Sequence, residues 1–347
     1  MTAMTATTAT TATTIPPVGE QAPSRPRVIV ERRDRGDHLF HGVITLGSLV
    51  VLAIMAAVGL FLFLQAAQAL RSTGVSFLTT SAWQPDRGEF GIAAVMTGTI
   101  AIAIVAVGIA LPVSMGTALF VTEIAPVRLR STCVALVDLM AAVPSVVYGL
   151  WGLFLLQGHT VGLARWLSTW LSWVPIFRVP GADPNNPLAS SSSYTASTFI
   201  AGIVVAMMVM PIQCAVMREV FSQVPSGESE GAYALGATRW GMIRIVSIPF
   251  GRAGIIGGTM LGLGRALGET IAVLLIISPR FDINLHVLEA GGNSVSSLIA
   301  LRYNEASGFG LSALMAAGLA LFAMTLVVNF TASIFIARSR SGASSDG

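Results

Sequence analysis

The chain has 347 residues, of which 54% are hydrophobic and only 11% are charged, and its mean hydropathy is +0.75. A soluble domain carries about 25% charged residues, so this composition excludes an ordinary soluble protein and indicates an integral membrane protein. The formal net charge of +3 gives little support to a nucleic-acid partner.

The lysine and cysteine content of the chain excludes further kinds of chemistry. All 20 basic residues are arginine, and a phosphate-binding Walker A loop needs a lysine, so we expect no nucleotide hydrolysis by this chain. Schiff-base chemistry on lysine is excluded for the same reason. Cys133 and Cys214 both fall in apolar segments, so they are interpreted as small packed residues and not as a disulfide or a metal site.

The first predicted element, residues 1–38, is a disordered basic tail. It opens with a low-complexity run of threonine and alanine that lacks the charged start and apolar block of a signal peptide. A cluster of arginines, from Arg25 to Arg35, then precedes the first apolar block. Such a cluster helps to fix the orientation of a membrane protein.

A membrane domain of six spans is predicted over residues 39–341. A helix needs about 20 apolar residues to cross a hydrocarbon core of about 30 Å. The windows that satisfy this length lie at 42–70, 91–121, 131–156, 199–217, 253–278 and 309–337. The predicted fold class is therefore all-α, with six membrane-spanning helices and both termini on one side.

The arginines predict which side that is. With six spans, thirteen arginines lie on the side of the termini, six lie on the opposite side, and Arg265 lies inside the membrane. The positive-inside rule therefore places both termini and the loop at 218–252 in the cytoplasm. The loop at 157–197 is then external. Its Trp166, Trp170 and Trp173 recur at helical spacing, which fits either a helix at the membrane interface or a cap on the bundle.

The cytoplasmic loop has the residues of a bent pair of short helices. Ser226 and Ser229 can cap a first helix that contains Glu230, and Gly236 can end it in a left-handed conformation. Thr238 can cap a second helix that stops before Pro249. Exposed anchors for a partner groove are expected at Tyr233, Leu235 and Trp240. The alternative is an ordinary amphipathic loop at the interface.

The fifth span contains two charges near the middle of the membrane. Arg265 lies about 18 Å along the span and Glu269 about 6 Å further. An intramembrane charge costs about 2.5–3.5 kcal/mol, and an i,i+4 ion pair returns only about 0.2–0.5 kcal/mol. Both charges should therefore face the bundle interior or a watery path. They handle an anion or a proton, or they form a structural salt bridge.

The same two charges close a predicted stripe on one helix face. Its members recur at intervals of three and four residues, in the order Gly254, Gly258, Gly262, Arg265 and Glu269. Small residues at this spacing let another helix approach closely. A guanidinium presents a fork of donors that matches phosphate or another oxyanion.

The third span adds one more ionisable residue and a predicted kink. Asp138 lies about 10 Å into the span, where it could pair with Arg265 on another helix. Pro144 should free a carbonyl and kink the helix. Broken helices often line a substrate path, so Ser145 and Tyr148 could offer hydroxyls to an anion; a kink that serves only packing is an equal alternative.

Three stretches resemble a known family. The residues at 230–275 begin EGAYALGATRWGMIRIVSIPF, those at 137–154 read VDLMAAVPSVVYGLWGLF, and those at 291–306 read GGNSVSSLIALRYNEA. They resemble the C-type permease subunit (PstC) of the bacterial high-affinity phosphate ABC importer, over residues 100–340. Gly231 stands where the general coupling motif has alanine, and Asp138 stands where glutamate is expected.

The resemblance implies the roles of several residues. Those that would couple the chain to an ATPase are Glu230, Gly231, Ala232, Gly236 and Pro249. Those of the substrate path would be Arg265 and Glu269, with Asp138, Ser145 and Tyr148 added from the reading of the third span.

The resemblance also implies the assembly. Expected partners are a homologous A-type permease, two ATP-binding subunits, an extracytoplasmic phosphate-binding protein and the lipid bilayer of the bacterial plasma membrane. This chain would itself be non-catalytic and bind no cofactor or metal. Alternatives are an ABC importer of sulfate or molybdate, or a proton-coupled anion carrier in which Glu269 shuttles protons.

Overall fold

The computed structural model describes residues 35–182, 191–306 and 308–340. Most of the predicted tail, residues 1–34, lies outside this part, as do residues 183–190 of the predicted outer loop. The chain forms two compact units, Met1–Ile54 and Met55–Gly347. In the first unit, helix α1 (Arg35–Thr73) begins, and its large apolar side chains from Leu39 to Ile54 are exposed.

In the second unit, the remainder of α1 packs against the long helix α13 (Phe309–Arg340). Gly59 lies so close to the Phe322 ring that an added Cβ would be 3.0 Å from it. The Ser312 hydroxyl donates to the Gln65 carbonyl at 2.7 Å and accepts from the Ala69 amide at 3.2 Å. After α1, the 3₁₀ turn η1 (Gly74–Leu78) leads into an antiparallel hairpin of β1 (Trp83–Gln84) and β2 (Glu89–Phe90), joined by η2 (Pro85–Arg87).

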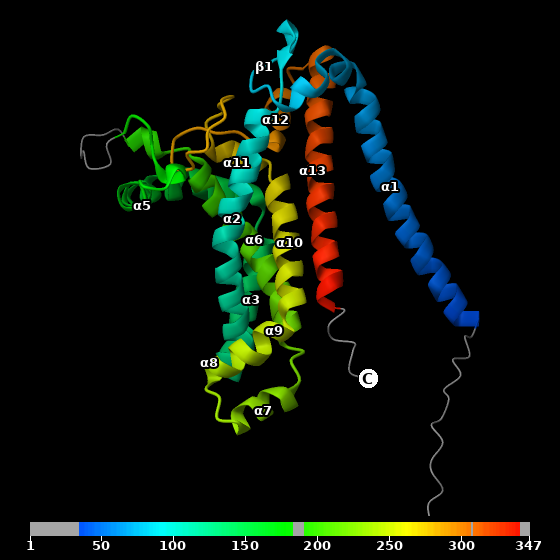
Figure 1. The fold of residues 1–347 in the computed structure, drawn as a ribbon, viewed down its shortest axis with the longest axis vertical. Helices are drawn as coiled ribbons and strands as arrows, with labels where there is room; N and C mark the ends of the chain where they lie inside the picture. The colour runs from blue at the N-terminus through cyan, green and yellow to red at the C-terminus, as the bar shows by residue number, and fades with distance from the viewer. Residues whose placement is uncertain (1–34, 183–190, 307, 341–347) are drawn as a thin grey trace, which may run out of the picture. The chain divides into compact units, whose positions relative to one another are not determined.

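The core lies between α2 (Ala93–Leu119), α6 (Thr198–Phe221) and α10 (Arg252–Gly268), which run alongside one another in Figure 1. Alanines and other small residues of α2, such as Ala103, Ala106 and Ala110, are fully buried. Gly202 of α6 is in direct contact with the Val105 side chain. Small residues allow this close approach, which membrane helices use in place of a hydrophobic driving force.

The third predicted span is broken. Helix α3 (Val127–Ala142) ends where Val143 and Pro144 are extended, and α4 (Ser145–Trp151) begins after them. From there the chain stays helical through the π-turn η4 (Gly152–Leu156) and α5 (Gln157–Trp170). The break confirms the disruption expected at Pro144. It also means that 131–156 is not one continuous helix, because the proline lacks the N–H that would continue α3.

By length and composition, five helices in the described part could cross a membrane, or up to six if one bent pair counts as a span. The long helical segments are Leu39–Leu78, Ala93–Ile124, Ser145–Trp170, Thr198–Phe221 and Phe309–Ile334. The bent pair joins Arg239–Phe250 to Arg252–Gly268 at 68°. Six spans were predicted, and the largest difference is the third, whose continuous helix starts at Ser145 and extends to Trp170.

The segments away from the loop at 218–252, which is predicted to be cytoplasmic, form a smaller core. It contains Ala164 of α5, Tyr194 of the 3₁₀ turn η6 (Ser191–Tyr194), and Val287 and Leu288. Arg280 donates to Glu289 at 2.8 Å and to Asp282 at 2.8 Å. The hydrogen bond that Arg280 donates to Glu289, together with the Asp282 carboxylate, raises the pKa of Arg280.

The three tryptophans of the predicted interfacial helix do not all lie on one helix. Trp166 and Trp170 lie on α5, whereas Trp173 follows its end. All three side chains are exposed, so they do not cap the core of this chain. A further 3₁₀ turn, η5 (Pro175–Phe177), continues this outer region.

Candidate functional site: the cytoplasmic coupling segment and a break beside Arg265

The segment predicted to couple to an ATPase, residues 226–249 and called the coupling segment below, begins with helix α7 (Ser226–Ala234). The predicted serine caps are wrong. Pro225 occupies the N-cap position, Ser226 is already helical, and the Ser229 hydroxyl donates to the Pro225 carbonyl at 3.5 Å. The ring of Pro225 fixes its φ at about −65°, and this helix start has no side-chain cap hydrogen bond. Glu230 and Gly231 are exposed on this helix.

Gly236 ends α7 as predicted. Its φ is +86°, its amide donates to the Tyr233 carbonyl at 2.9 Å, and the Ala237 amide donates to the Ala232 carbonyl at 3.0 Å. These two hydrogen bonds form a Schellman motif, which needs a residue that tolerates a left-handed conformation. The glycine therefore fixes the angle at which the chain leaves α7.

The second helix starts as predicted but ends later. Thr238 caps α8 (Arg239–Met242) by accepting from the Gly241 amide at 3.1 Å. The chain then continues through the π-turn η7 (Ile243–Ser247) into α9 (Ile248–Phe250), so it does not stop before Pro249. Proline is tolerated at this position because it lies in the first turn of α9, where its missing N–H matters little. The bend of 68° follows at Gly251.

One face of the coupling segment is anchored to the bundle. Met242 and Ile243 are each 2% exposed and pack with residues of α2, α3 and α6, including Leu119 and Phe221. The Ser247 hydroxyl donates to a carboxylate oxygen of Glu123 at 3.1 Å. This face therefore ties the segment to the ends of two bundle helices.

In the part of the chain that the structure describes, the other face is exposed. Leu235 is 91% exposed, Trp240 65% and Tyr233 44%. These are the three anchors expected from the sequence, and Ile245 joins them at 67%. Figure 1 places α7 and α8 at one end of the second unit, away from β1 and α12. The exposed apolar residues therefore lie on the side predicted to be cytoplasmic.

Glu123 is a residue that the sequence reasoning missed. It lies in the π-turn η3 (Phe120–Ile124), which continues α2, and it is half-buried. Arg130 supports this turn by donating to the carbonyls of Val121 and Thr122 at 2.8 and 2.7 Å. The available signal was a single carboxylate at the end of a long uncharged segment.

The glycines of α10 face α6. A Cβ at Gly254 would lie 2.5 Å from Val220, and one at Gly258 would lie 3.3 Å from the Gln213 carbonyl. Gly262 is in direct contact with the Gln213 side chain. The buried stripe then continues to Ala266, while Arg265 is exposed on the flank.

Glu269 does not belong to that stripe, which corrects the sequence prediction. Helix α10 ends at Gly268, Glu269 is extended with ψ 128°, and α11 (Ile271–Ile276) follows. A glycine-rich helix end has weak helix propensity. The Glu269 carboxylate accepts from the Ala272 amide, in the first turn of α11, at 3.4 Å. We call this interruption at Glu269 and Thr270 the Glu269 break.

The ion pairs also differ from the prediction. Asp138 lies 4.0 Å from Arg218 and not beside Arg265, because α3 packs near the end of α6 that carries Arg218. Within the described ranges, no ion pair involves Arg265 or Glu269. The two charges therefore do not form a salt bridge in this conformation.

Tyr148 spans the break at Pro144. Its hydroxyl donates to the Met140 carbonyl at 2.9 Å. Residue 144 would bond this carbonyl in an unbroken helix, but proline has no N–H, and the Val143 amide donates to it at 3.3 Å instead. Its ring lines an apolar pocket of about 250 Å³ with Val143 and Trp151. Ser145, at the start of α4, is half-buried.

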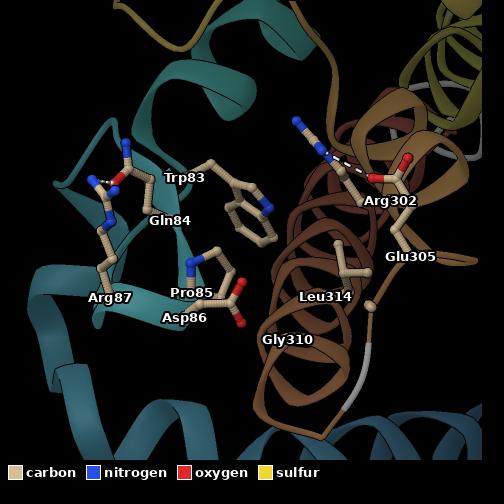
Figure 2. Close-up of a pocket in the computed structure, with 10 residues that line it drawn as sticks. Trp83, Gln84, Pro85, Asp86, Arg87, Arg302, Glu305, Gly310 and Leu314 are labelled. Atoms are coloured by element: carbon tan, nitrogen blue, oxygen red, sulfur yellow. Dashed lines mark hydrogen bonds and ion pairs between the residues drawn. The ribbon is translucent and has the colours of Figure 1, made fainter.

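A separate pocket of about 440 Å³ lies between the β1–β2 hairpin and the start of α13, as Figure 2 shows. Arg302 forms an ion pair with Glu305 at 3.0 Å, and Arg87 donates to Gln84 at 3.1 Å. None of the residues predicted for the substrate path lines this pocket. In the described part of the chain, no group of three His, Cys, Asp or Glu residues could hold a metal ion.

Comparison with known proteins gives consistent relatives. Residues 114–341 match the family described as "Binding-protein-dependent transport system inner membrane component". "Phosphate transport system permease protein PstC 2" of Mycobacterium tuberculosis is 39% identical over 303 residues, covering 86% of this chain and 91% of the relative. "Phosphate transport system permease protein PstC" of Haemophilus influenzae is 36% identical, covering 87% and 93%.

Solved structures support the fold. The crystal structure of a bacterial alginate ABC transporter in complex with an alginate-bound periplasmic protein matches with a TM-score of 0.56 and 16% identity, covering 86% of this chain and 93% of the matched chain. A second structure, of a bacterial ABC transporter involved in the import of alginate, matches with a TM-score of 0.53 and 16% identity, covering 87% and 99%. At this identity the likeness concerns the fold alone.

Proposed function

The chain belongs to the binding-protein-dependent transport system inner membrane components, as a phosphate permease of the PstC type, and we propose that residues 226–249 couple it to a separate ATPase. It is a multi-pass component of the bacterial plasma membrane and the permease subunit of a phosphate ABC importer. The relatives are phosphate permeases, so cargo such as sulfate or molybdate, or a proton-coupled carrier, is not favoured.

The observation that carries the coupling proposal is the two-sided coupling segment. Its inner residues Met242 and Ile243 are buried against the bundle, while Leu235 and Trp240 are exposed. A segment that transmits a push must be rigid and must leave a face free for its partner. The Schellman motif at Gly236 and the Thr238 cap supply the rigidity, and the exposed apolar side chains supply the face.

Two contacts would carry a movement of the coupling segment into the bundle helices. Closure of the ATPase subunits would move α7 and α8, and the hydrogen bond between Ser247 and Glu123 would pass the motion to α2. The bend at Gly251 would pass it to α10. These two helices and α6 form the bundle core, so their tilting would change which side of the membrane has access to the path.

The substrate path is proposed at the Glu269 break. Arg265 is exposed on α10 and has no ion pair in the described residues. A membrane charge that faced lipid would cost about 2.5–3.5 kcal/mol, so Arg265 should instead face a wet path shared with a homologous A-type permease. There it would offset part of the desolvation of phosphate, and Glu269 would limit the affinity so that the anion can leave.

Three further residues are assigned to this path with a smaller role than Arg265 and Glu269. They are Asp138, Ser145 and Tyr148. Asp138 is held by Arg218 and so acts near the cytoplasmic end of α6. Tyr148 and Ser145 lie at the break of the third span. In this conformation the Tyr148 proton is donated to Met140, so Tyr148 could donate to an anion only after that bond opens.

The proposed assembly follows from the family. Membership implies an ATPase and a binding protein as partners. We assign two ATP-binding subunits, one homologous A-type permease and one extracytoplasmic phosphate-binding protein. ATP is hydrolysed by the partner subunits, and this chain contributes no cofactor.

The test compares two glutamates of α7 in cells that lack this chain. Phosphate uptake at low micromolar phosphate is measured after complementation with wild type, Glu230→Arg or Glu228→Arg, with the membrane content of each variant as a control. Both residues are exposed on the same short helix. We expect Glu230→Arg to abolish uptake and Glu228→Arg to retain most of it. Equal uptake with both variants would contradict coupling through Glu230.

A further inference from the structure

The start of α12 (Val295–Arg302) is a buried cluster of hydrogen-bond donors. The Ser294 hydroxyl caps the helix by accepting from the Ser297 amide at 3.1 Å. The Val295 amide donates to the Thr99 hydroxyl of α2 at 3.0 Å. Gly98 lies in direct contact with the Asn293 carbonyl, so α2 presses against the residues that precede the helix.

Two side chains in this cluster are buried without partners. Asn293 is 4% exposed and Ser296 is 7% exposed. Among the residues that the structure describes, neither the Asn293 amide nitrogen nor the Ser296 hydroxyl has a hydrogen-bond partner. The Asn293 side-chain oxygen accepts from the Ser294 amide at 2.9 Å, which holds the free nitrogen at the start of the helix. Buried polar groups without partners are rare, and each calls for an explanation such as strain or a bound water, ion or ligand.

The cluster lies beside the proposed path. The Ser297 hydroxyl is 3.5 Å from the Thr270 carbonyl and 2.6 Å from the Ser294 hydroxyl. Thr270 is the second residue of the Glu269 break, which follows Arg265 by one helical turn. The start of α12 and the intramembrane charges therefore converge on the same interruption in the bundle.

We propose that the start of α12 is an oxyanion-binding step on the phosphate path, with Asn293 and Ser296 as ligands. An oxyanion presents only acceptor oxygens on most of its surface, and these two side chains offer free donors. The helix dipole favours an anion at this end. The two side chains would supply the donors, because the amides of Val295 and Ser297 already donate within the protein. Because both side chains are buried here, the anion enters only when the bundle opens, as a site used at one stage of transport requires.

The proposal rests on the phosphate-permease function and refines it. Two kinds of group would then bind the anion: the charged Arg265, and the neutral donors at the start of α12. Neutral donors bind an anion without an ion pair that must be broken for release. The predicted defect of a variant here is therefore a transporter that still hydrolyses ATP but moves less phosphate.

The experiment uses the complete transporter in proteoliposomes with its phosphate-binding protein. Phosphate moved and ATP hydrolysed are measured together for wild type, Asn293→Asp, Ser296→Ala and Ser312→Ala. Asn293→Asp keeps the oxygen that accepts from Ser294 and replaces the free donor by a carboxylate oxygen. Ser312 is a matched control, because it is also 7% exposed but its hydrogen bonds join α13 to α1.

We expect the ratio of phosphate to ATP to fall at least tenfold in Asn293→Asp and severalfold in Ser296→Ala, and to stay unchanged in Ser312→Ala. A purely structural role would lower transport and hydrolysis in proportion and leave the ratio unchanged, which would overturn the proposal. If Asn293→Asp does not assemble, Ser296→Ala, the smaller change, decides alone. Wild-type liposomes that move no phosphate would overturn the proposed function as well.

Discussion

The two ends of α10 interrupt the bundle in different ways. At Gly251 the chain turns by 68° against a buried face, and a Cβ there would collide with the Phe221 ring. At the Glu269 break the chain is extended, and the neighbouring Arg265 is exposed without an ion pair in the described part of the chain. The Gly251 end packs against other residues of this chain. At the Glu269 break, Arg265 has no ion-pair partner among the described residues.

This difference suggests that the two ends of α10 have different functions. A well-packed bend can transmit displacement, because packed elements move as units and do not deform continuously. An exposed arginine beside a broken helix can meet an anion, because the break brings polar backbone and a charge to the same depth. Variants at the two ends should therefore fail in different ways.

The largest effect is expected at the second end. Arg265→Ala removes the charge proposed to meet phosphate, and hydrogen bonds to a charged group contribute about 1.5–3 kcal/mol. Uptake should fall by roughly 10- to 100-fold, while the assembled complex remains intact. Arg252→Ala, at the other end of the same helix and also exposed, is the matched control and should retain most uptake. Normal transport by Arg265→Ala would remove this residue from the path.

An intermediate effect is expected where α7 ends. Gly236 has φ +86°, and a β-branched residue there is strained by about 1–3 kcal/mol. Gly236→Val should therefore misdirect α8 and lower uptake severalfold. Gly231→Ala lies in the interior of α7 with open space around it, so it should stabilise the helix by about 0.5–1 kcal/mol and leave uptake intact. Protease sensitivity of the coupling segment reports the first change, and equal behaviour of both variants would argue against a rigid segment.

The smallest effect is expected at the link to α2. Ser247→Ala removes the hydrogen bond to Glu123, which contributes about 0.5–1.5 kcal/mol. Uptake should fall by about two- to tenfold, and Ser247→Thr, which keeps the hydroxyl, should restore it if the enlarged side chain fits. Binding of the ATPase should not change in either variant. A loss of ATPase binding would mean that Ser247 shapes the docking face and does not transmit motion.

The coupling segment could be predicted closely because its geometry is local. Gly236 and Thr238 determine a helix end and a helix start through their own backbone and side chain, and both predictions are confirmed. The serine caps failed because Pro225 already fixes the start of α7. The prediction that the second helix stops before Pro249 is wrong, because a proline in the first turn of a helix does not interrupt it.

The path residues could be predicted only in part because their geometry is not local. Extending a helical stripe from Gly262 to Glu269 assumed an unbroken helix, and the helix ends at Gly268. The partner of Asp138 depends on how far α3 slides along α6, which no spacing within one segment reveals. Glu123 was missed for the same reason, since Ser247 lies far from it in the sequence.

Coupling requires above all that the exposed face of the coupling segment binds the ATPase. The direct measurement is the amount of ATPase that co-purifies with this chain carrying Leu235→Asp, compared with Val75→Asp on η1. Leu235 is 91% exposed and Val75 is 80% exposed, so neither change should disturb the core. We predict at least a tenfold loss of ATPase with Leu235→Asp and none with Val75→Asp. Equal recovery of ATPase with the two variants would contradict the claim.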